Sequence, residues 1–158
     1  MLLPFFEWME GLSMSTYFLS TVWPTPIIQV LHLIALGVFS GAVVLVDLRL
    51  LGRGLTDMPL AKLAREAEPW FIGAFMVLLI TGLPQLTSTA MKQYYSPFFW
   101  MKMEAMVIAL IFTFTLRRKA TRTDESRLGR YYPKAVALVS LGLWSGVAIG
   151  ARLIGLFS

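Results

Sequence analysis

The chain has 158 residues, of which 57% are hydrophobic, and its mean hydropathy of +0.69 is above that of a water-soluble domain of this size. It carries 14 basic and 9 acidic residues, a net charge of +5, and no cysteine, which excludes disulfides, thiolate metal sites, iron–sulfur clusters and cysteine-attached haem. The apolar residues form blocks of about 20, the length that crosses a hydrocarbon layer. These properties predict one all-α membrane domain over residues 1–158.

The first segment, about 3–20, is rich in Phe, Trp and Leu. It carries Glu7 and Glu10 where a secretory signal would carry basic residues, so we expect it to remain in the mature protein. We predict an N-terminal interfacial helix that lies at the membrane surface.

Four apolar segments follow, and we predict that each forms a transmembrane helix. Pro69, with Glu66 and Glu68 before it, is a helix-start signal for the second, and the basic run 117–119 is expected to end the third. The expected spans are about 26–46, 70–87, 97–116 and 135–157. The pattern predicts an up-down-up-down four-helix bundle.

The basic residues predict the orientation of this bundle. They gather in two loops: Arg49, Arg53, Lys62 and Arg65 after the first span, and Arg117, Arg118, Lys119, Arg122, Arg127, Arg130 and Lys134 after the third. The outer segments hold only Lys92. Because Lys and Arg in short loops stay on the cytoplasmic side, we predict a bacterial inner-membrane protein with both termini in the periplasm. The lipid bilayer then accounts for the positive charge, and no nucleic-acid partner is expected.

Small residues recur at intervals of four on two of the predicted helices. The glycines concerned are Gly37 and Gly41 on the first helix, and Gly142, Gly146 and Gly150 on the fourth. This spacing lets two helix backbones approach closely in a membrane. Two interpretations remain open at this point: packing between helices of one molecule, and contact between copies in a homo-oligomer.

Polar residues are expected to form one layer in the outer half of the membrane. The layer consists of Gln29, His32, Gln85, Lys102, Glu104 and Arg152. Such groups usually face the bundle interior and pair with one another, although Lys102 and Arg152 are long enough to reach the outer head groups instead. Helical spacing places His32 near the azimuth of Phe39 and Val43 and away from Gly37.

His32 is the only histidine, and its chemistry allows three roles. As an axial ligand of b-type haem it would need a second ligand, such as Met106 or His32 of another copy, because no second histidine is present. As a copper ligand it could join a methionine such as Met103. As a structural residue it would form a hydrogen bond with Glu104 or Gln29.

Asp47 and Arg49 lie at the inner boundary, about 15 residues and hence roughly 22 Å from His32, so we assign them to a different site. Asp47 is expected to interact with a basic residue and to fix the end of the first helix. The sequence shows no nucleophile with a base, no carboxylate pair, no phosphate-binding loop and no zinc spacing. It therefore favours a role other than independent catalysis.

One segment carries a family resemblance, DLRLLG at 47–52, preceded by WP at 23–24, IQVLH at 28–32 and Gly41. Weaker similarity continues through TG at 81–82 and PFF at 97–99 to Lys102. In these features the chain resembles the DUF6644-like proteins, a bacterial inner-membrane family of unknown function. That family is similar in layout to copper-resistance D-like and cytochrome b561-like four-helix proteins, some of which bind haem through helix histidines.

The resemblance implies that His32 is the first-helix histidine of the family and Lys102 its third-helix lysine. Relatives often carry a further histidine near the end of the third helix, where this chain reads FTFT at 112–115. We therefore expect a non-catalytic membrane subunit that packs with itself or with a larger membrane complex. The alternatives are a haem or copper electron-transfer protein that uses His32, and a small oligomeric transporter or channel.

Overall fold

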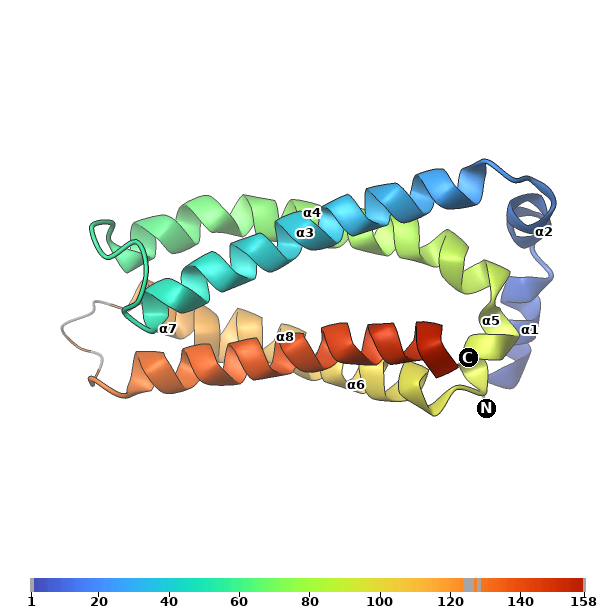
Figure 1. Ribbon diagram of the computed structural model, residues 1–158. Helices are drawn as coiled ribbons and strands as arrows, with labels where there is room; N and C mark the ends of the chain where they lie inside the picture. The colour runs from blue at the N-terminus through green and yellow to red at the C-terminus, as the bar shows by residue number, and fades with distance from the viewer. Residues whose placement is uncertain (1, 124–126, 128, 158) are drawn as a thin grey trace.

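The computed structural model is an all-α bundle, and it describes residues 2–123, 127 and 129–157, with side chains described as far as Ile154. Its long helices are α3 (Pro24–Leu50), α4 (Leu60–Ser88), α6 (Pro97–Phe112) and α8 (Tyr132–Phe157). Four helical segments are long and apolar enough to cross a membrane, the arrangement of a multi-pass membrane protein. They alternate in direction, so both chain ends lie at one end of the bundle (Figure 1). The predicted four-helix fold is confirmed.

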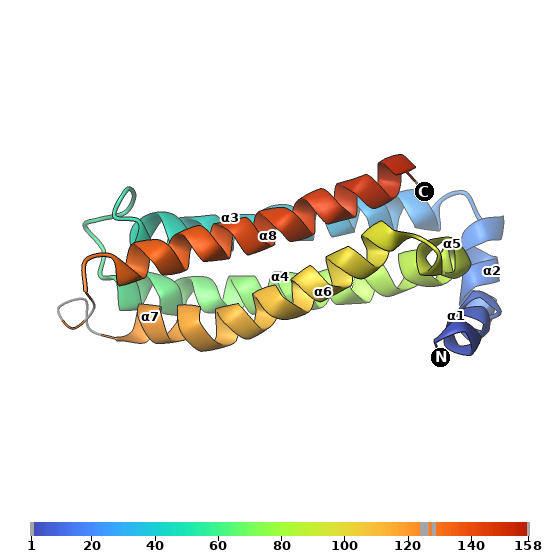
Figure 2. The ribbon, with the colours of Figure 1, turned by 90° about the horizontal axis from the view of Figure 1, so that it is seen from below.

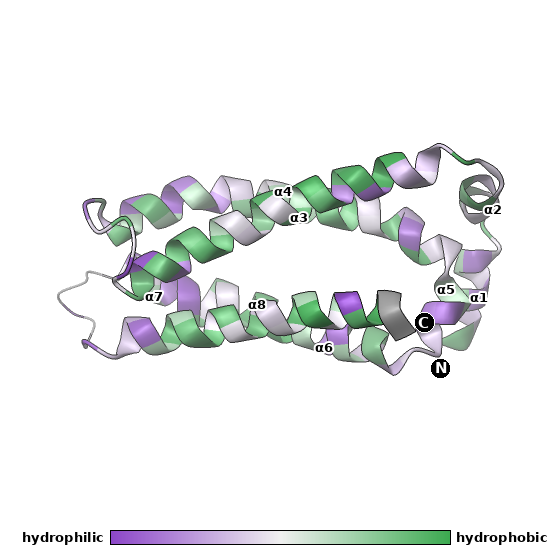
Figure 3. Ribbon diagram, viewed as in Figure 1, coloured by the Kyte–Doolittle hydropathy of each residue, from purple (hydrophilic) through white to green (hydrophobic). Residues whose placement is uncertain are grey.

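The bundle consists of two helix pairs, since α3 packs mainly on α4, and α6 on α8. Figure 1 shows the α3–α4 pair above the α6–α8 pair. The turned view of Figure 2 shows α3 and α8 on one side of the bundle and α4 and α6 on the other. We call the end with the chain termini the terminal end, and the opposite end, which carries the two basic loops, the basic end. Hydrophilic residues gather around α7 at the basic end, whereas hydrophobic residues line most of α3 and α8 (Figure 3).

Helix α4 (Leu60–Ser88) begins at Leu60, so the prediction that Glu66, Glu68 and Pro69 mark a helix start is wrong. Pro69 lies inside the helix. A proline there removes one backbone hydrogen bond, which favours a helix start when only local sequence is considered. Burial of Leu60 and Leu63 in a core cluster with Val46 keeps this turn helical in the folded chain.

The third span also continues past its predicted end. After α6 the chain forms a π-helical turn, η1 (Thr113–Arg117), and then α7 (Arg118–Arg122). The basic run therefore remains helical and does not enter a loop. Arg117 is only 8% exposed, because its side chain turns toward the bundle. A charged residue that finds a partner inside the protein need not mark the end of a span.

The N-terminal segment forms two short helices, α1 (Leu3–Glu10) and α2 (Ser13–Ser20), where one helix is predicted. Leu12 is extended between them and changes the chain direction. Phe6 and Met9 of α1 are buried against α5 (Ala90–Tyr94) and α6, in a cluster with Ala90 and Phe99. Helix α2 packs on α4 instead. The segment thus closes the terminal end of the bundle (Figure 1).

Candidate functional site

A buried polar cluster lies near the basic end of the bundle. Asp47 on α3 and Ser140 on α8 are fully buried. The Nε of Arg117 donates a hydrogen bond of 2.8 Å to Asp47 Oδ1, and Ser140 Oγ donates one of 2.6 Å to Asp47 Oδ2. Both carboxylate oxygens therefore have a partner, as a buried charge requires. The cluster joins the first, third and fourth spans.

The π-helical turn explains how Arg117 reaches this position. Such a turn adds a residue to the helix and rotates the side chains that follow it. Arg117 ends the turn, and its Nη2 also donates a hydrogen bond of 3.2 Å to the carbonyl of Val43. The guanidinium is thus held by two atoms of α3. The expectation that Asp47 interacts with a basic residue agrees with this geometry.

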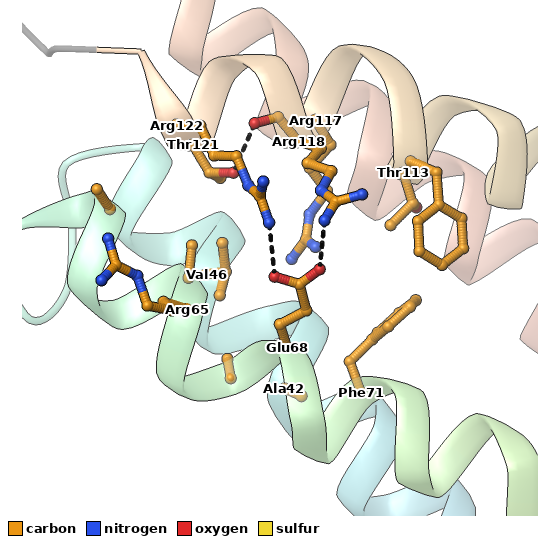
Figure 4. A pocket seen from close by; sticks show the side chains of 14 residues that line it. Ala42, Val46, Arg65, Glu68, Phe71, Thr113, Arg117, Arg118, Thr121 and Arg122 are labelled. Atoms are coloured by element: carbon orange, nitrogen blue, oxygen red, sulfur yellow. Dashed lines mark hydrogen bonds and ion pairs between the residues drawn. The ribbon is translucent and has the colours of Figure 1, made fainter.

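Next to this cluster lies a cavity of about 430 Å³ at the basic end, between α4 and the η1–α7 segment. Arg118 and Arg122 each place an Nη2 atom 3.2 Å from a carboxylate oxygen of Glu68 (Figure 4). Arg65 and Arg117 also line the cavity. Four arginines therefore surround a single carboxylate. Because Glu68 and its partners are partly exposed, these two ion pairs contribute little to stability by themselves.

His32 lies toward the terminal end and contacts α4. Its Nδ1 is 2.7 Å from Thr81 Oγ1, which itself donates a hydrogen bond of 2.7 Å to the carbonyl of Val77. With the hydroxyl hydrogen on the Val77 carbonyl, Thr81 would accept from His32, which corresponds to the tautomer with the ring hydrogen on Nδ1. The predicted structural partners, Glu104 and Gln29, are therefore wrong. A Cβ atom at Gly82 would lie 3.6 Å from His32 Cε1, so the ring packs against this glycine.

The other members of the predicted polar layer do not pair with one another in the described part of the chain. Gln85 donates to the backbone carbonyl of Thr81. Gln29, Glu104 and Arg152 are exposed on the outside of the bundle, and Lys102 is only partly buried. The layer is therefore not a connected network. Among the described residues, no group of three His, Cys, Asp or Glu side chains has the geometry of a metal site.

The two methionines predicted as ligands, Met103 and Met106, both lie on α6. Met103 packs against the cluster formed by Phe6, Ala90 and Phe99 at the terminal end. Met106 is partly buried on the same helix. The ligand roles of both remain predictions.

The family model of DUF6644, described as a family of unknown function, matches residues 5–158. The chain belongs to this family. The resemblance carried by the DLRLLG segment is thereby confirmed. Comparison with curated proteins and with solved structures found no match. The function of this DUF6644 chain must therefore be argued from its geometry.

The DLRLLG segment of the DUF6644 chain has a structural explanation. Its Asp47 is the acceptor of the buried cluster, and its Arg49 donates a hydrogen bond of 2.9 Å from Nε to the carbonyl of Met58, which fastens the loop after α3. Gly52 adopts a φ of +72°, and the amides of Gly52 and Arg53 bond the carbonyls of Arg49 and Leu48. This is a Schellman motif, in which glycine avoids the strain of a left-handed residue. The segment ends α3 and orients Asp47.

Four of the five glycines at four-residue spacing lie on the outside of the bundle. A Cβ atom built on any of these four meets no heavy atom within 4 Å: Gly37, Gly41, Gly142 and Gly146. Packing between helices of one molecule is therefore wrong for them. Gly150 differs, because a Cβ atom there would lie 3.4 Å from Lys102 Cβ. Its small size allows α8 to approach α6.

Both sets of outward glycines belong to a shared pattern, Gly-x-aromatic-Ser-Gly, at 37–41 and 142–146. The two aromatic residues, Phe39 and Trp144, pack together with ring centroids 4.7 Å apart. Since a helix turns roughly 100° per residue, glycines two positions before and after an aromatic point away from it. The aromatic contact therefore places two small-residue surfaces at the same depth on neighbouring helices. We call these surfaces, 37–41 on α3 and 142–146 on α8, the glycine faces.

Sequence reasoning missed Arg117, Ser140, Glu68 and Thr81 as site residues. Ser140 could have been found, because Val136, Ala137 and Ser140 follow helical spacing on the buried side of α8. Arg117 could not, since it stands first in a run of basic residues that otherwise face solvent or the cavity.

Proposed function

We propose that this DUF6644 chain is a non-catalytic subunit of a membrane assembly, and that its glycine faces pack against a second copy or a larger membrane complex. The observation that carries the proposal is the open space over Gly37, Gly41, Gly142 and Gly146. Glycine lowers helix stability relative to larger residues, so outward glycines at helical spacing need a reason outside the monomer. Close contact with another helix supplies that reason.

The serines of the glycine faces support the same proposal. Ser40 and Ser145 are exposed on the helix surface, and neither hydroxyl forms a hydrogen bond with the described part of the chain. A hydroxyl without a partner is unfavourable in hydrocarbon. Serine at a helix contact can donate to a neighbouring helix. Each glycine face therefore offers both a close approach and a hydrogen-bond donor.

We place the chain in a bacterial inner membrane, with the basic end on the cytoplasmic side and both termini in the periplasm. The basic loops after α3 and after α7 lie at one end of the bundle, and the termini lie at the other (Figure 1). The positive-inside rule favours this orientation. Trp8, Tyr17 and Trp23 are exposed at the terminal end, where aromatic rings suit a membrane interface.

The proposal predicts that larger side chains at the glycine faces prevent assembly with the partner but leave the subunit folded. Wild-type protein purified from native membranes in mild detergent should elute as a dimer or larger assembly. The double variant Gly41→Leu with Gly146→Leu should elute as a monomer, because its side chains prevent close helix approach. Light scattering coupled to size exclusion gives the mass of each species.

Gly73→Leu is the matched control. Gly73 lies on α4, is exposed, and has open space above it like the glycines of the faces. It should leave the assembly unchanged. A monomeric wild type, or equal dissociation by Gly73→Leu, would remove support for the proposal.

A second candidate function, binding of haem or copper through His32, is favoured by one observation. Nδ1 of His32 lies 2.7 Å from Thr81 Oγ1, and in the tautomer in which Nδ1 donates to Thr81, Nε2 keeps a free lone pair. Metal-binding histidines are usually oriented in this way by a hydrogen bond from the other ring nitrogen. His32 does not line the cavity at the basic end, so a haem on His32 would lie outside that cavity.

This candidate predicts a Soret band in protein purified from haem-replete cells, and loss of the band in His32→Ala. Absorption spectra of oxidised and dithionite-reduced samples, with metal analysis of the same samples, measure both. Gln29→Ala is a control one turn away on the same helix, and it should keep the band. A colourless and metal-free wild type excludes this function.

A further inference from the structure

The cavity at the basic end is unevenly charged, and neither the family nor the proposed assembly accounts for it. Its charged lining residues are Arg65, Glu68, Arg117, Arg118 and Arg122, so four positive charges minus one negative charge leave a net charge of +3. Glu68 already binds Arg118 and Arg122. Arg65 forms no hydrogen bond or ion pair with the described residues. Buried Asp47 pairs with Arg117, so three minus one leaves an excess of two positive charges among the described residues around the cavity, which favours an anion.

Arg117 provides a second observation, independent of the total charge. It is 92% buried, since only 8% of it is exposed, and it lines the cavity. An arginine side chain has five N–H groups. Two of them form the bonds to Asp47 and Val43, and the other three form none with the described chain. A guanidinium held rigidly by one edge presents its remaining donors in fixed directions, which suits a phosphate oxygen.

The side of the cavity away from the arginines is largely apolar, and this indicates the kind of ligand. Ala42, Phe71 and Phe114 form that side, and Phe114 is 45% exposed on the bundle surface. Figure 4 shows Phe71 on the side opposite to Arg65 and Arg122. A free phosphate would leave this apolar side uncovered. A phospholipid would place its phosphate among the arginines and its acyl chain along the phenylalanines.

We propose that the cavity binds the phosphate of an anionic phospholipid from the inner leaflet, with Arg65, Arg117 and Arg122 as donors. The inference rests on the proposed cytoplasmic position of the basic end. Basic pockets between helices on that side bind anionic head groups. A volume of about 430 Å³ is in the range of small-molecule sites, roughly 300–1,000 Å³, and it accommodates a head group with the start of an acyl chain.

The test measures binding of phosphatidylglycerol to the full chain in neutral-detergent micelles by native mass spectrometry. Saturable binding of one lipid per chain is expected, about tenfold tighter than binding of phosphatidylcholine, because both lipids carry the phosphate but the arginines repel the choline cation. The double variant Arg65→Gln with Arg122→Gln should weaken binding about tenfold or more. Glu68→Gln should tighten binding, because it removes the competing carboxylate, and a folding defect would not have this effect.

The matched control is Arg53→Gln with Lys119→Gln, which removes the same charge from exposed positions at the same end but outside the cavity. It should change affinity less than about twofold. Equal weakening by both double variants would overturn the site, since binding would then follow overall charge. Displacement of the lipid by millimolar inorganic phosphate would overturn the lipid as ligand. The same spectra report oligomeric mass, so loss of lipid binding with the assembly intact would overturn this inference alone.

Discussion

Substitution of Arg117 by methionine should lower the free energy of unfolding by about 3–5 kcal/mol, the cost of removing one partner from a buried ion pair. Arg117→Met keeps most of the side-chain volume but leaves the fully buried Asp47 without its positive partner. Among the described residues, Ser140 would be the one remaining side-chain donor to the carboxylate. Tryptophan fluorescence during unfolding in mixed micelles of mild detergent and dodecyl sulfate measures the change.

Two further variants show whether the buried pair causes this loss. Arg118→Met makes the same change one residue later, where the partly exposed pair with Glu68 should cost less than about 1 kcal/mol. Combining Arg117→Met with Asp47→Asn removes both charges and should restore most of the lost stability. If Arg117→Met and Arg118→Met cost the same, the buried cluster does not hold the three helices together.

The second prediction concerns the orientation of the bundle in the membrane. The expected labelling of each introduced thiol is either complete or absent. Because the chain has no cysteine, one introduced thiol reports the location of one position without background. Arg53→Cys at the basic end and Lys92→Cys at the terminal end replace basic residues that are both exposed. In intact cells, a membrane-impermeant maleimide should label Lys92→Cys fully and Arg53→Cys not at all.

Permeabilised cells supply the control for this experiment. Once the inner membrane is opened, both thiols should react, which shows that neither is buried. The reversed pattern in intact cells would place the basic end outside and would remove the phospholipid inference with it. Labelling of both thiols in intact cells would contradict a membrane-spanning bundle.

Two local sequence signals predicted the wrong helix boundary, because tertiary packing opposed them. Pro69 predicted a helix start, yet α4 begins at Leu60 because buried leucines keep its first turns helical. The basic run at 117–119 predicted a helix end, yet Arg117 turns inward to a carboxylate. In both cases a contact with a residue distant in sequence outweighs a preference of the local backbone.

For the candidate sites, too, the sequence predicted some features and missed those that depend on contacts between distant residues. The sequence predicted that Asp47 would find a basic partner and that the histidine and glycine sides of the first helix would differ. It did not predict that the partners of Asp47 would be Arg117 and Ser140, which lie 70 and 93 residues away. It also assigned His32 to Glu104 or Gln29, whereas the imidazole binds Thr81.

The sequence by itself determined the number of spans, the fold class and the gathering of basic residues at one end of the bundle. Those properties follow from the length of apolar segments and from where charges interrupt them, and both are read directly along the chain. Only the tertiary structure decided which face of each helix is buried, since in a membrane span both faces are apolar. The outward glycines, the buried Asp47 and the arginine-lined cavity all depend on that choice, because each is formed by how neighbouring helices are rotated against one another.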